Sequence, residues 1–398
     1  MHHKVFANLE ERGLARVTAA CDPGLERLDQ ICDTHCFVQR GVATYKDFDE
    51  MIKAHCAQMD LGVIAAPIQF HAPMHEVFVR NRAACFLEKP PTLDPEEFQR
   101  MLVVEEQAVV PTNVGFGYIH IQERLALKRR MLSGEFGALK RMSFLGLVQR
   151  APSYYQRNNW AGKLMLGGNL LLDSCLGNAM AHFVNSMLFY GNQSQLQEWA
   201  RPVEMACEMY RANPIEGTDT IFAIGHLDNG VELRMAASHA CPNGKQITEE
   251  RMEFEHATIT ILSSDTVIIE GPGMRVETFS IPGASLAGCV EHYIEFLRGN
   301  SAVPAQTLRD CLGFVETNAL FYLAGGQIHD LPPEALSHAQ PESAIVLPDM
   351  ENAGRRLIAE ALLPSQAGFS WAKPGGKCTI QDLPKLSAVV LGMRSLRY

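Results

Sequence analysis

A lysine stands at the carboxyl end of a short apolar run. Residues 83–87 have the composition of a buried strand, and the tripeptide Glu88-Lys89-Pro90 follows them directly. In open α/β sheets, ligands bind in the crevice at the carboxyl ends of the strands, so a lysine fixed there points toward the ligand. Its side chain can donate a proton or a hydrogen bond to a carbonyl or hydroxyl oxygen. We therefore predict a functional role for Lys89 rather than that of an ordinary surface lysine.

Length and charge restrict the class of protein. A chain of 398 residues is longer than a single core usually supports, so two domains are expected. The net charge of −10 and the absence of a basic run argue against a nucleic-acid partner. The absence of a long apolar run and of an apolar leader argues against a membrane partner, so the predicted location is the cytoplasm.

The cysteines predict neither disulfides nor a metal centre. The chain has 11 of them, scattered singly, which is typical of reduced thiols that fill small spaces in a core. Cys32, His35 and Cys36 form the only metal-like cluster, and no second half stands at ligand spacing. We therefore expect no metal.

The order of elements predicts the fold class. Strand-like runs at 14–22, 61–67, 83–87 and 109–115 alternate with helical segments, which is typical of a parallel sheet. Beyond residue 115 the runs are longer, and 218–226 faces 231–239 across an Asn-Gly turn, a strong hairpin signal. We predict an α/β fold with a parallel, Rossmann-like domain at 1–115, followed at 116–398 by an α+β domain with a large open, mostly antiparallel sheet.

Several motifs, in this order and spacing, resemble the glucose-fructose oxidoreductase, inositol dehydrogenase and MocA (Gfo/Idh/MocA) family of NAD(P)-dependent oxidoreductases. The resemblance covers nearly the whole chain. It implies a Rossmann domain, an open antiparallel α/β domain, and oxidation of a sugar or polyol at the cleft between them. The matching motifs are Cys21-Asp22-Pro23, Ala65-Ala66-Pro67 with His71, Glu88-Lys89-Pro90, Ser133-Gly134 with Phe136-Gly137, and Gly167-Gly168 with Asp173.

The resemblance assigns a set of cofactor residues. Asp22 stands where the family has an acid after the second strand of its Rossmann domain. An acid there accepts both ribose hydroxyls of a dinucleotide and repels a 2′-phosphate, which favours NAD over NADP within the NAD(P) class. A turn or helix cap is the alternative for Asp22. Ala66 and Pro67 resemble the turn under the adenosine-side phosphates. His71 opens the next helix, where capping is as good an interpretation as cofactor binding, and Glu88 and Lys89 complete the set.

The region of Asp173 departs from the family pattern, which has a histidine four residues after the aspartate. Gly177 stands there instead. A helix starting near residue 174 would put Asn178 and His182 on one face. Histidine suits a general base, whereas an amide can bind a hydroxyl group but not take its proton. Either His182 acts as the base or it is a core histidine, in which case Lys89 is the acid/base group with Asp173 as its charge partner.

Residues 154–163 are rich in aromatic and hydrogen-bonding side chains. Aromatic faces pack on the apolar faces of sugar rings, while arginine and asparagine donate to hydroxyl groups. An interface between domains or subunits is the alternative use of this segment. The predicted substrate-binding residues are Tyr154, Arg157, Asn158, Trp160 and Asn178.

A Rossmann domain normally begins with a strand and a Gly-x-Gly-x-x-Gly turn, and this sequence opens on a helical segment instead. We expect the first strand and the phosphate-binding turn to lie upstream of Met1, so that either the start is misassigned or the chain is a true truncation. The functional hypothesis is an NAD(P)-dependent oxidoreductase acting on a secondary alcohol of a sugar or polyol, and acting as a homo-oligomer. The alternative is a non-catalytic sugar-binding or regulatory protein that has lost dinucleotide binding.

Overall fold

The computed structural model describes residues 2–242, 246–263, 265–339 and 344–395. They form two compact units, which are described separately. Unit 1 comprises Met1–Pro91, Gln99–His120 and Ala284–Leu308, and unit 2 comprises Thr92–Phe98, Ile121–Gly283 and Arg309–Tyr398. Within the described residues, no helix is long and apolar enough to span a membrane.

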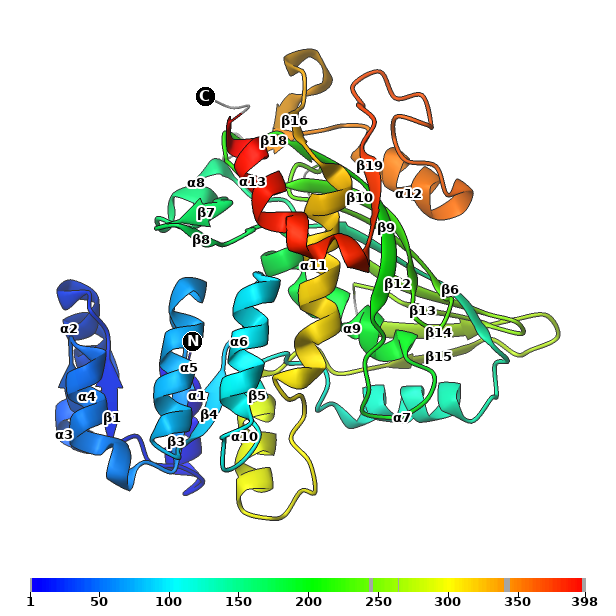
Figure 1. Ribbon diagram of the computed structural model, residues 1–398. Helices are drawn as coiled ribbons and strands as arrows, with labels where there is room; N and C mark the ends of the chain where they lie inside the picture. Colours follow the sequence, from blue (N-terminus) through cyan, green and yellow to red (C-terminus); the bar gives the residue numbers. More distant parts are fainter. Residues whose placement is uncertain (1, 243–245, 264, 340–343, 396–398) are drawn as a thin grey trace. The chain divides into compact units, whose positions relative to one another are not determined.

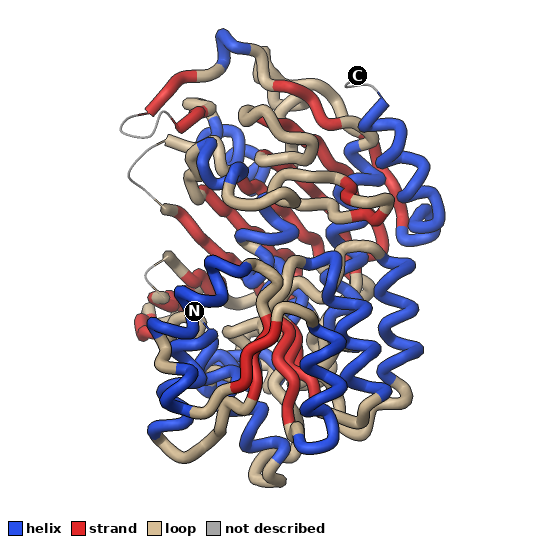
Figure 2. Tube along the Cα trace, turned by 90° about the vertical axis from the view of Figure 1, so that its left-hand side faces the viewer, coloured by secondary structure: helices blue, strands red, loops and turns tan. Residues whose placement is uncertain are grey.

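Unit 1 contains the predicted parallel strands. β1 pairs with β2 in one small sheet, and β3, β4 and β5 form another, with every pair parallel. Figure 2 shows strands in red and helices in blue. The sequence did not predict β2, because its three residues do not lie within a longer strand-like run, as those of β1 do. The strands are β1 (Ala19–Cys21), β2 (Ala43–Tyr45), β3 (Leu61–Ile64), β4 (Ala84–Leu87) and β5 (Asn113–Val114).

Helices fill the connections between these strands, as expected for parallel pairing. Helix α1, which precedes β1, packs Leu9 into a core that also contains Phe86 of β4 and Tyr293 of α10. Helix α5 approaches β3 so closely that a Cβ atom on Gly62 would lie 2.3 Å from the ring of Phe78. The helices of unit 1 are α1 (His2–Glu11), α2 (Leu25–Thr34), α3 (Phe37–Arg40), α4 (Phe48–His55), α5 (His71–Arg80) and α10 (Leu286–Leu297), and α6 (Pro95–Glu105) spans the boundary between the units.

The observed units differ from the predicted division at residue 115. Helix α10 lies within 116–398, the range predicted as the second domain, but it belongs to unit 1. Its Val290 and Tyr293 are fully buried against Ala84 and Phe86 of β4. The chain returns to unit 1 at residues 284–308 after forming most of the large sheet of unit 2. The sequence does not reveal this return, because it depends on packing between segments that are far apart in the chain.

Unit 2 is built on one large sheet of ten strands. Most neighbours are antiparallel, and the pairs β6–β11 and β9–β16 are parallel. The predicted hairpin is confirmed: β10 pairs with β11, and the turn contains Gly230 at φ +84°. The strands are β6 (Leu139–Leu147), β9 (Pro202–Arg211), β10 (Thr220–Leu227), β11 (Glu232–Ser238), β12 (Ile247–Phe254), β13 (Thr258–Ile261), β14 (Thr266–Glu270), β15 (Glu277–Ser280), β16 (Ile328–Asp330) and β19 (Gly376–Thr379).

Side chains alternate between the two faces of this sheet, as the two-residue period of a strand requires. One face packs on α9 and α11, where Phe144 of β6 stacks on Phe183 (Figure 1). The opposite face packs on α12 and the segment after it, through a cluster that includes Phe222, Leu357 and Trp371. The helices of unit 2 are α7 (Gln122–Leu132), α8 (Pro152–Gln156), α9 (Ala181–Gly191), α11 (Leu312–Gly325), α12 (Met350–Glu360) and α13 (Leu386–Ser395).

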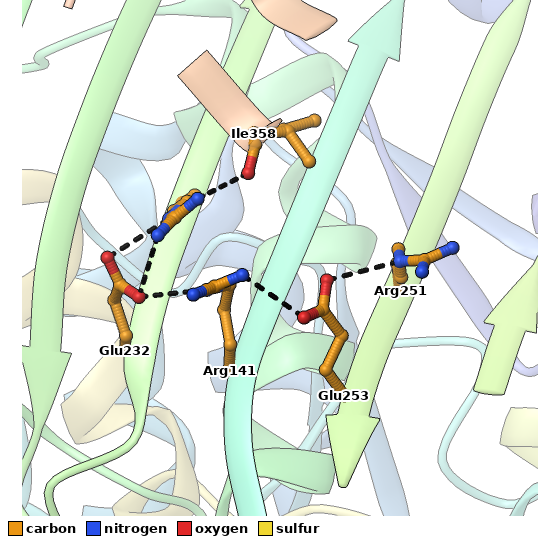
Figure 3. Close-up of polar contacts among 6 residues, drawn as sticks. Arg141, Glu232, Arg251, Glu253 and Ile358 are labelled. Carbon is orange, nitrogen blue, oxygen red and sulfur yellow. Dashed lines mark hydrogen bonds and ion pairs between the residues drawn. The ribbon is translucent and has the colours of Figure 1, made fainter. Parts of the chain in front are cut away.

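Beyond α12, the same face of the sheet is charged rather than apolar. Arg141 bonds Glu232 at 2.9 Å and Glu253 at 3.1 Å, so the guanidinium joins carboxylates on the two flanking strands (Figure 3). Arg234 bonds Glu232 at 3.0 Å and also donates to the carbonyl oxygen of Ile358 in α12. The hydrogen bond from Arg234 to Ile358 fixes the end of α12 on the sheet, and the ion pairs give this part of the face a polar surface.

Candidate functional site

Lys89 lies at the carboxyl end of β4, as predicted. The strand is fully buried, and Glu88 continues its pairing by donating its N–H to the carbonyl oxygen of Ile64 at the end of β3. The carboxylate of Glu88 accepts from the N–H of Lys89 at 3.2 Å and contacts Nε2 of His2 at 2.8 Å. Because β3, β4 and β5 are parallel, their carboxyl ends meet at one edge of the sheet, and Lys89 stands at that edge.

His71 joins two of the loops at this edge. Its Nδ1 lies 2.9 Å from the carbonyl oxygen of Pro90, and its Nε2 lies 2.9 Å from that of Ala66. Burial lowers the pKa of His71, and hydrogen bonding to the carbonyl of Ala66 opposes this. A neutral imidazole has one N–H, so it donates to one of the two loops at a time. The side chain makes no helix cap: the N-cap residue of α5 is Phe70, which has no capping bond.

Asp22 follows β1 directly, as predicted for a ribose-binding acid. Its Oδ1 accepts from the N–H of Gly24 at 2.9 Å, so the carboxylate also closes the turn into α2. The two interpretations of Asp22 are compatible, because a carboxylate has two oxygens and several lone pairs. Ala66 and Pro67 follow β3 and lead into a short 3₁₀ turn, Ile68–Phe70, at the same edge of unit 1 as Lys89.

In unit 2, Asp173 is buried and accepts hydrogen bonds at both oxygens. Oδ2 accepts from the N–H of Gly162 at 2.6 Å, and Oδ1 accepts from Nδ2 of Asn178 at 2.9 Å. The pKa of Tyr154 is raised, mainly by burial and then by the charge of Asp173. The carboxylate therefore organises the segment 154–163 on one side and the turn at 174–179 on the other.

The helix predicted to start near residue 174, which was to carry both Asn178 and His182, is not one continuous α-helix. Cys175–Ala179 form a single π-helical turn, closed by the N–H of Met180 bonding the carbonyl oxygen of Cys175 at 2.9 Å, and α9 begins only at Ala181. A π turn has a wider spacing than an α-helix, so the four-residue spacing of Asn178 and His182 does not by itself place them on one face. Such turns are frequent at functional sites.

Gly177 occupies a position with little space for a side chain. A Cβ atom there would lie 3.0 Å from Oδ1 of Asn318, from Cδ1 of Leu93 and from Oγ of Ser174. Ser174 caps the turn by accepting from the N–H of Gly177 at 2.8 Å. The glycine is therefore part of a tight packing arrangement, and a histidine would not fit without movement of Asn318 or Leu93.

The predicted sugar-reading side chains largely bind within their own loop. The guanidinium of Arg157 lies 3.6 Å from the ring centroid of Tyr154 and 5.3 Å from that of Trp160. Oδ1 of Asn158 accepts from the N–H groups of Trp160 and Ala161 at 3.1 and 2.7 Å. These contacts shape the loop.

A cavity of about 360 Å³ lies beside this loop. Its polar lining comes from Tyr155, Gln156, Lys163 and Glu216, none of which was among the predicted site residues. The first three lie inside the segment 154–163 that the sequence singled out, whereas Glu216 gave no signal beyond a polar neighbourhood. The remaining lining residues are Pro152, Ala161, Gly162, Pro214 and Ile215.

Polar contacts fix two of the lining groups. Tyr155 Oη lies 2.8 Å from Nδ1 of His239, and the buried carboxylate of Glu216 accepts from the N–H of Leu164 at 3.1 Å. Nζ of Lys163 is 3.8 Å from Glu216. The cavity thus combines fixed donors and acceptors with an apolar wall, which suits a ligand that has both hydroxyl groups and apolar ring faces.

Among the described residues, no group of three or more His, Cys, Asp or Glu side chains is arranged to hold a metal ion. In the metal-like cluster of Cys32, His35 and Cys36, the histidine packs against other rings. The ring of His35 lies 5.3 Å from that of His3 and 6.3 Å from that of Phe37.

Parallel strands whose carboxyl ends carry Asp22, Ala66 and Lys89 define a dinucleotide-binding class of domain. Residues 1–116 match the family described as "Oxidoreductase family, NAD-binding Rossmann fold" (GFO_IDH_MocA). Residues 1–116 thus belong to the NAD-binding domain of this oxidoreductase family. No curated protein matches the sequence.

Solved structures share the fold at low sequence identity. The WlbA dehydrogenase from Bordetella pertussis, in complex with NADH and UDP-GlcNAcA, is 18% identical, with a TM-score of 0.65 over 81% of this chain and 91% of that chain. A UDP-N-acetylglucosamine 3-dehydrogenase, GnnA from Acidithiobacillus ferrooxidans, is 17% identical, with a TM-score of 0.62 over 81% and 92%. Levoglucosan dehydrogenase in complex with NADH is 12% identical, with a TM-score of 0.64 over 80% and 92%.

Proposed function

We propose that this protein oxidises a secondary alcohol of a sugar, a polyol or a sugar nucleotide with NAD, and that Lys89 is its principal proton-transfer group. The observation that carries the proposal is the position of Lys89 at the carboxyl end of β4, inside the region that matches an NAD-binding family. Sugar and sugar-nucleotide dehydrogenases among the structural neighbours support the substrate class.

The residues of unit 1 fit a dinucleotide. Asp22 supplies a carboxylate after β1, and the small residues Ala65 and Ala66 follow β3 at the carboxyl ends of parallel strands. Such ends bind ribose and phosphate groups in this kind of domain. When bound, NAD supplies the hydride acceptor.

The chain's own contribution is the proton transfer. In the direction of oxidation, Nζ of Lys89 in its neutral form takes the proton of the substrate hydroxyl as the hydride leaves the same carbon. In the reverse direction the ammonium returns that proton to the carbonyl oxygen. We assign Asp173 and His182 to the catalytic set as well, with Asp173 as the carboxylate whose geometry is best defined.

The cavity beside the loop is the proposed place for part of the substrate. Tyr155, Gln156, Lys163 and Glu216 offer donors and acceptors to hydroxyl groups. We propose as substrate-binding residues Tyr154, Arg157, Asn158, Trp160 and Asn178. The protein is further proposed to act in the cytoplasm and to form a homo-oligomer. Light scattering coupled to gel filtration tests the oligomeric state directly.

The test is a turnover assay that follows NADH at 340 nm. The probes are NAD⁺ or NADP⁺ with UDP-N-acetylglucosamine, levoglucosan, myo-inositol or glucose. We expect turnover with NAD⁺ and at least one probe, and a loss of at least 100-fold in kcat for Lys89→Ala, on the scale of general acid–base catalysis. Lys53→Ala, an exposed lysine of α4, is the matched control. Full turnover by Lys89→Ala would sink the mechanism.

A second candidate function is a sugar-binding or regulatory protein without catalysis. Gly177, which stands where the family has a histidine, favours it, because an acid/base group is lost there. A fluorescence titration separates the two functions. Binding of NADH supports the enzyme, whereas stabilisation by a sugar probe without any response to millimolar NADH or NADPH supports the binder.

A further inference from the structure

We propose that Tyr322 is a positioning residue for Asp173, and that it acts by holding Leu172 in a left-handed backbone conformation. This inference rests on the proposed function, because it assigns the part of the fold that sets the geometry of a proposed catalytic carboxylate. Tyr322 lies in the interior of α11, 149 residues from Asp173 in the sequence.

Leu172 has φ +48°, a conformation that a bulky L-residue rarely adopts. Its side chain is fully buried, and its N–H bonds the carbonyl oxygen of Leu164 at 3.1 Å. Left-handed backbone at such a residue persists only when its surroundings enforce it, and it is concentrated at functional sites. The residue directly after this conformation is Asp173.

The hydroxyl of Tyr322 supplies the restraint. It donates to the carbonyl oxygen of Leu172 at 3.0 Å and lies 3.4 Å from the carbonyl oxygen of Asp173. The side chain is fully buried, and burial followed by the charge of Asp173 raises the pKa of Tyr322. The hydroxyl therefore keeps its proton and remains a donor.

Other contacts hold Asp173 in place when the backbone of Leu172 has this conformation. Its N–H bonds the carbonyl oxygen of Lys163 at 3.0 Å, and its Oδ2 accepts from Gly162. A Cβ atom on Gly217 would lie 2.5 Å from the carbonyl oxygen of Asp173, so only glycine allows this approach. The carboxylate is thus held against residues 162 and 163, which line the cavity.

An ordinary core tyrosine would give a different result on mutation, since loss of its hydroxyl would weaken the fold without a specific effect on Asp173. Tyr322→Phe keeps the ring and removes the donor. Tyr293→Phe is the matched control, because Tyr293 is also fully buried and donates its hydroxyl to a backbone carbonyl, that of Pro111, at 2.8 Å in unit 1.

The first measurement is hydrogen exchange followed by mass spectrometry, which needs no substrate. In Tyr322→Phe we expect exchange at the Gly162 amide to accelerate at least tenfold, because its acceptor, Asp173, loses its fixed position. Tyr293→Phe should leave this amide unchanged. Gly217→Ala disturbs Asp173 from the other side and should give the same signature, which keeps the test valid if Tyr322→Phe folds poorly.

The second measurement uses the probe that gives turnover. We expect kcat of Tyr322→Phe to fall at least tenfold while the Kd for NADH stays within twofold. An unchanged Gly162 amide, or equal acceleration throughout unit 2, overturns the proposal. Accelerated exchange at Gly162 in a protein without turnover on any probe supports the positioning of Asp173 and counts against the proposed function, so the two failures are distinguishable.

Discussion

Oδ1 of Asn318 lies 3.0 Å from the point where a Cβ atom on Gly177 would stand. The two residues share a closed space, since Asn318 is fully buried and its Nδ2 donates to the carbonyl oxygen of Phe314 at 2.9 Å within α11. The space beside the π turn is therefore filled from α11, which explains in packing terms why position 177 has no side chain.

We predict that Gly177→Ala lowers the free energy of unfolding by about 1–3 kcal/mol, the usual cost of overpacking a core. Asn318→Ala in the same chain should recover part of this loss, because it removes one of the two polar atoms that lie 3.0 Å from the added Cβ atom. Urea denaturation of the two single variants and the double variant measures the coupling. Gly392→Ala, in α13 with nothing within 4 Å, should be neutral or slightly stabilising. A Gly177→Ala variant as stable as the wild type would contradict the packing argument.

Acid should destabilise the protein through His239. Burial, followed by the charges of Arg150 and Arg157, lowers the pKa of His239 to about 3. The folded state then binds fewer protons than the unfolded state, so this contribution to stability is complete above the unfolded pKa of about 6.5 and is lost as the pH falls below it.

We expect about 2 kcal/mol of unfolding free energy to be lost from this residue between pH 7 and pH 5. Denaturant titrations at several pH values measure the slope. His239→Gln should have a smaller slope than the wild type, while His338→Gln, at an exposed position, should keep it. Parallel slopes for the wild type and His239→Gln would show that another group is responsible.

The bridge made by His71 predicts a local effect on the loop of Lys89. His71→Leu removes the ring nitrogens that face the carbonyl oxygens of Ala66 and Pro90, and it should lower the free energy of unfolding by about 1–3 kcal/mol. Turnover should fall as well, because the Lys89-Pro90 segment loses its restraint. His71→Gln, which keeps a donor, should recover part of both. Thermal unfolding and the turnover assay check this, and equal values for the two variants would rule out the bridge.

Asp22 should set the preference between the two dinucleotides. We expect Asp22→Ser to weaken NADH binding by about tenfold, the worth of one charge-assisted hydrogen bond, and to weaken NADPH binding less, because a carboxylate repels a 2′-phosphate. Asp29→Ser, at an exposed position of α2, is the control. Fluorescence titration with both cofactors gives the ratio of the Kd for NADPH to the Kd for NADH. If Asp22→Ser leaves this ratio unchanged, Asp22 is not part of the cofactor site.

Local patterns predicted the elements that carry strong local signals. The apolar run before Glu88 is β4, and the Asn-Gly pair is the turn of the β10–β11 hairpin. Weak local signals did not suffice. β2 does not lie within a longer strand-like run, and the turn after Ser174 was predicted as an ordinary helix because a π turn has no distinct sequence pattern.

The sequence by itself determined the parallel pairing of the strands of unit 1 and the placement of Lys89 at a strand end, because these follow from periodicity and from the residues next to each run. The surroundings of Asp173 were decided by the tertiary structure alone. Its partners Gly162 and Asn178 are near in sequence, but Tyr322 arrives from α11, as does the Asn318 that closes the space beside Gly177. Contacts between residues so far apart depend on how helices pack on the sheet, and a periodic pattern carries no information about that packing partner.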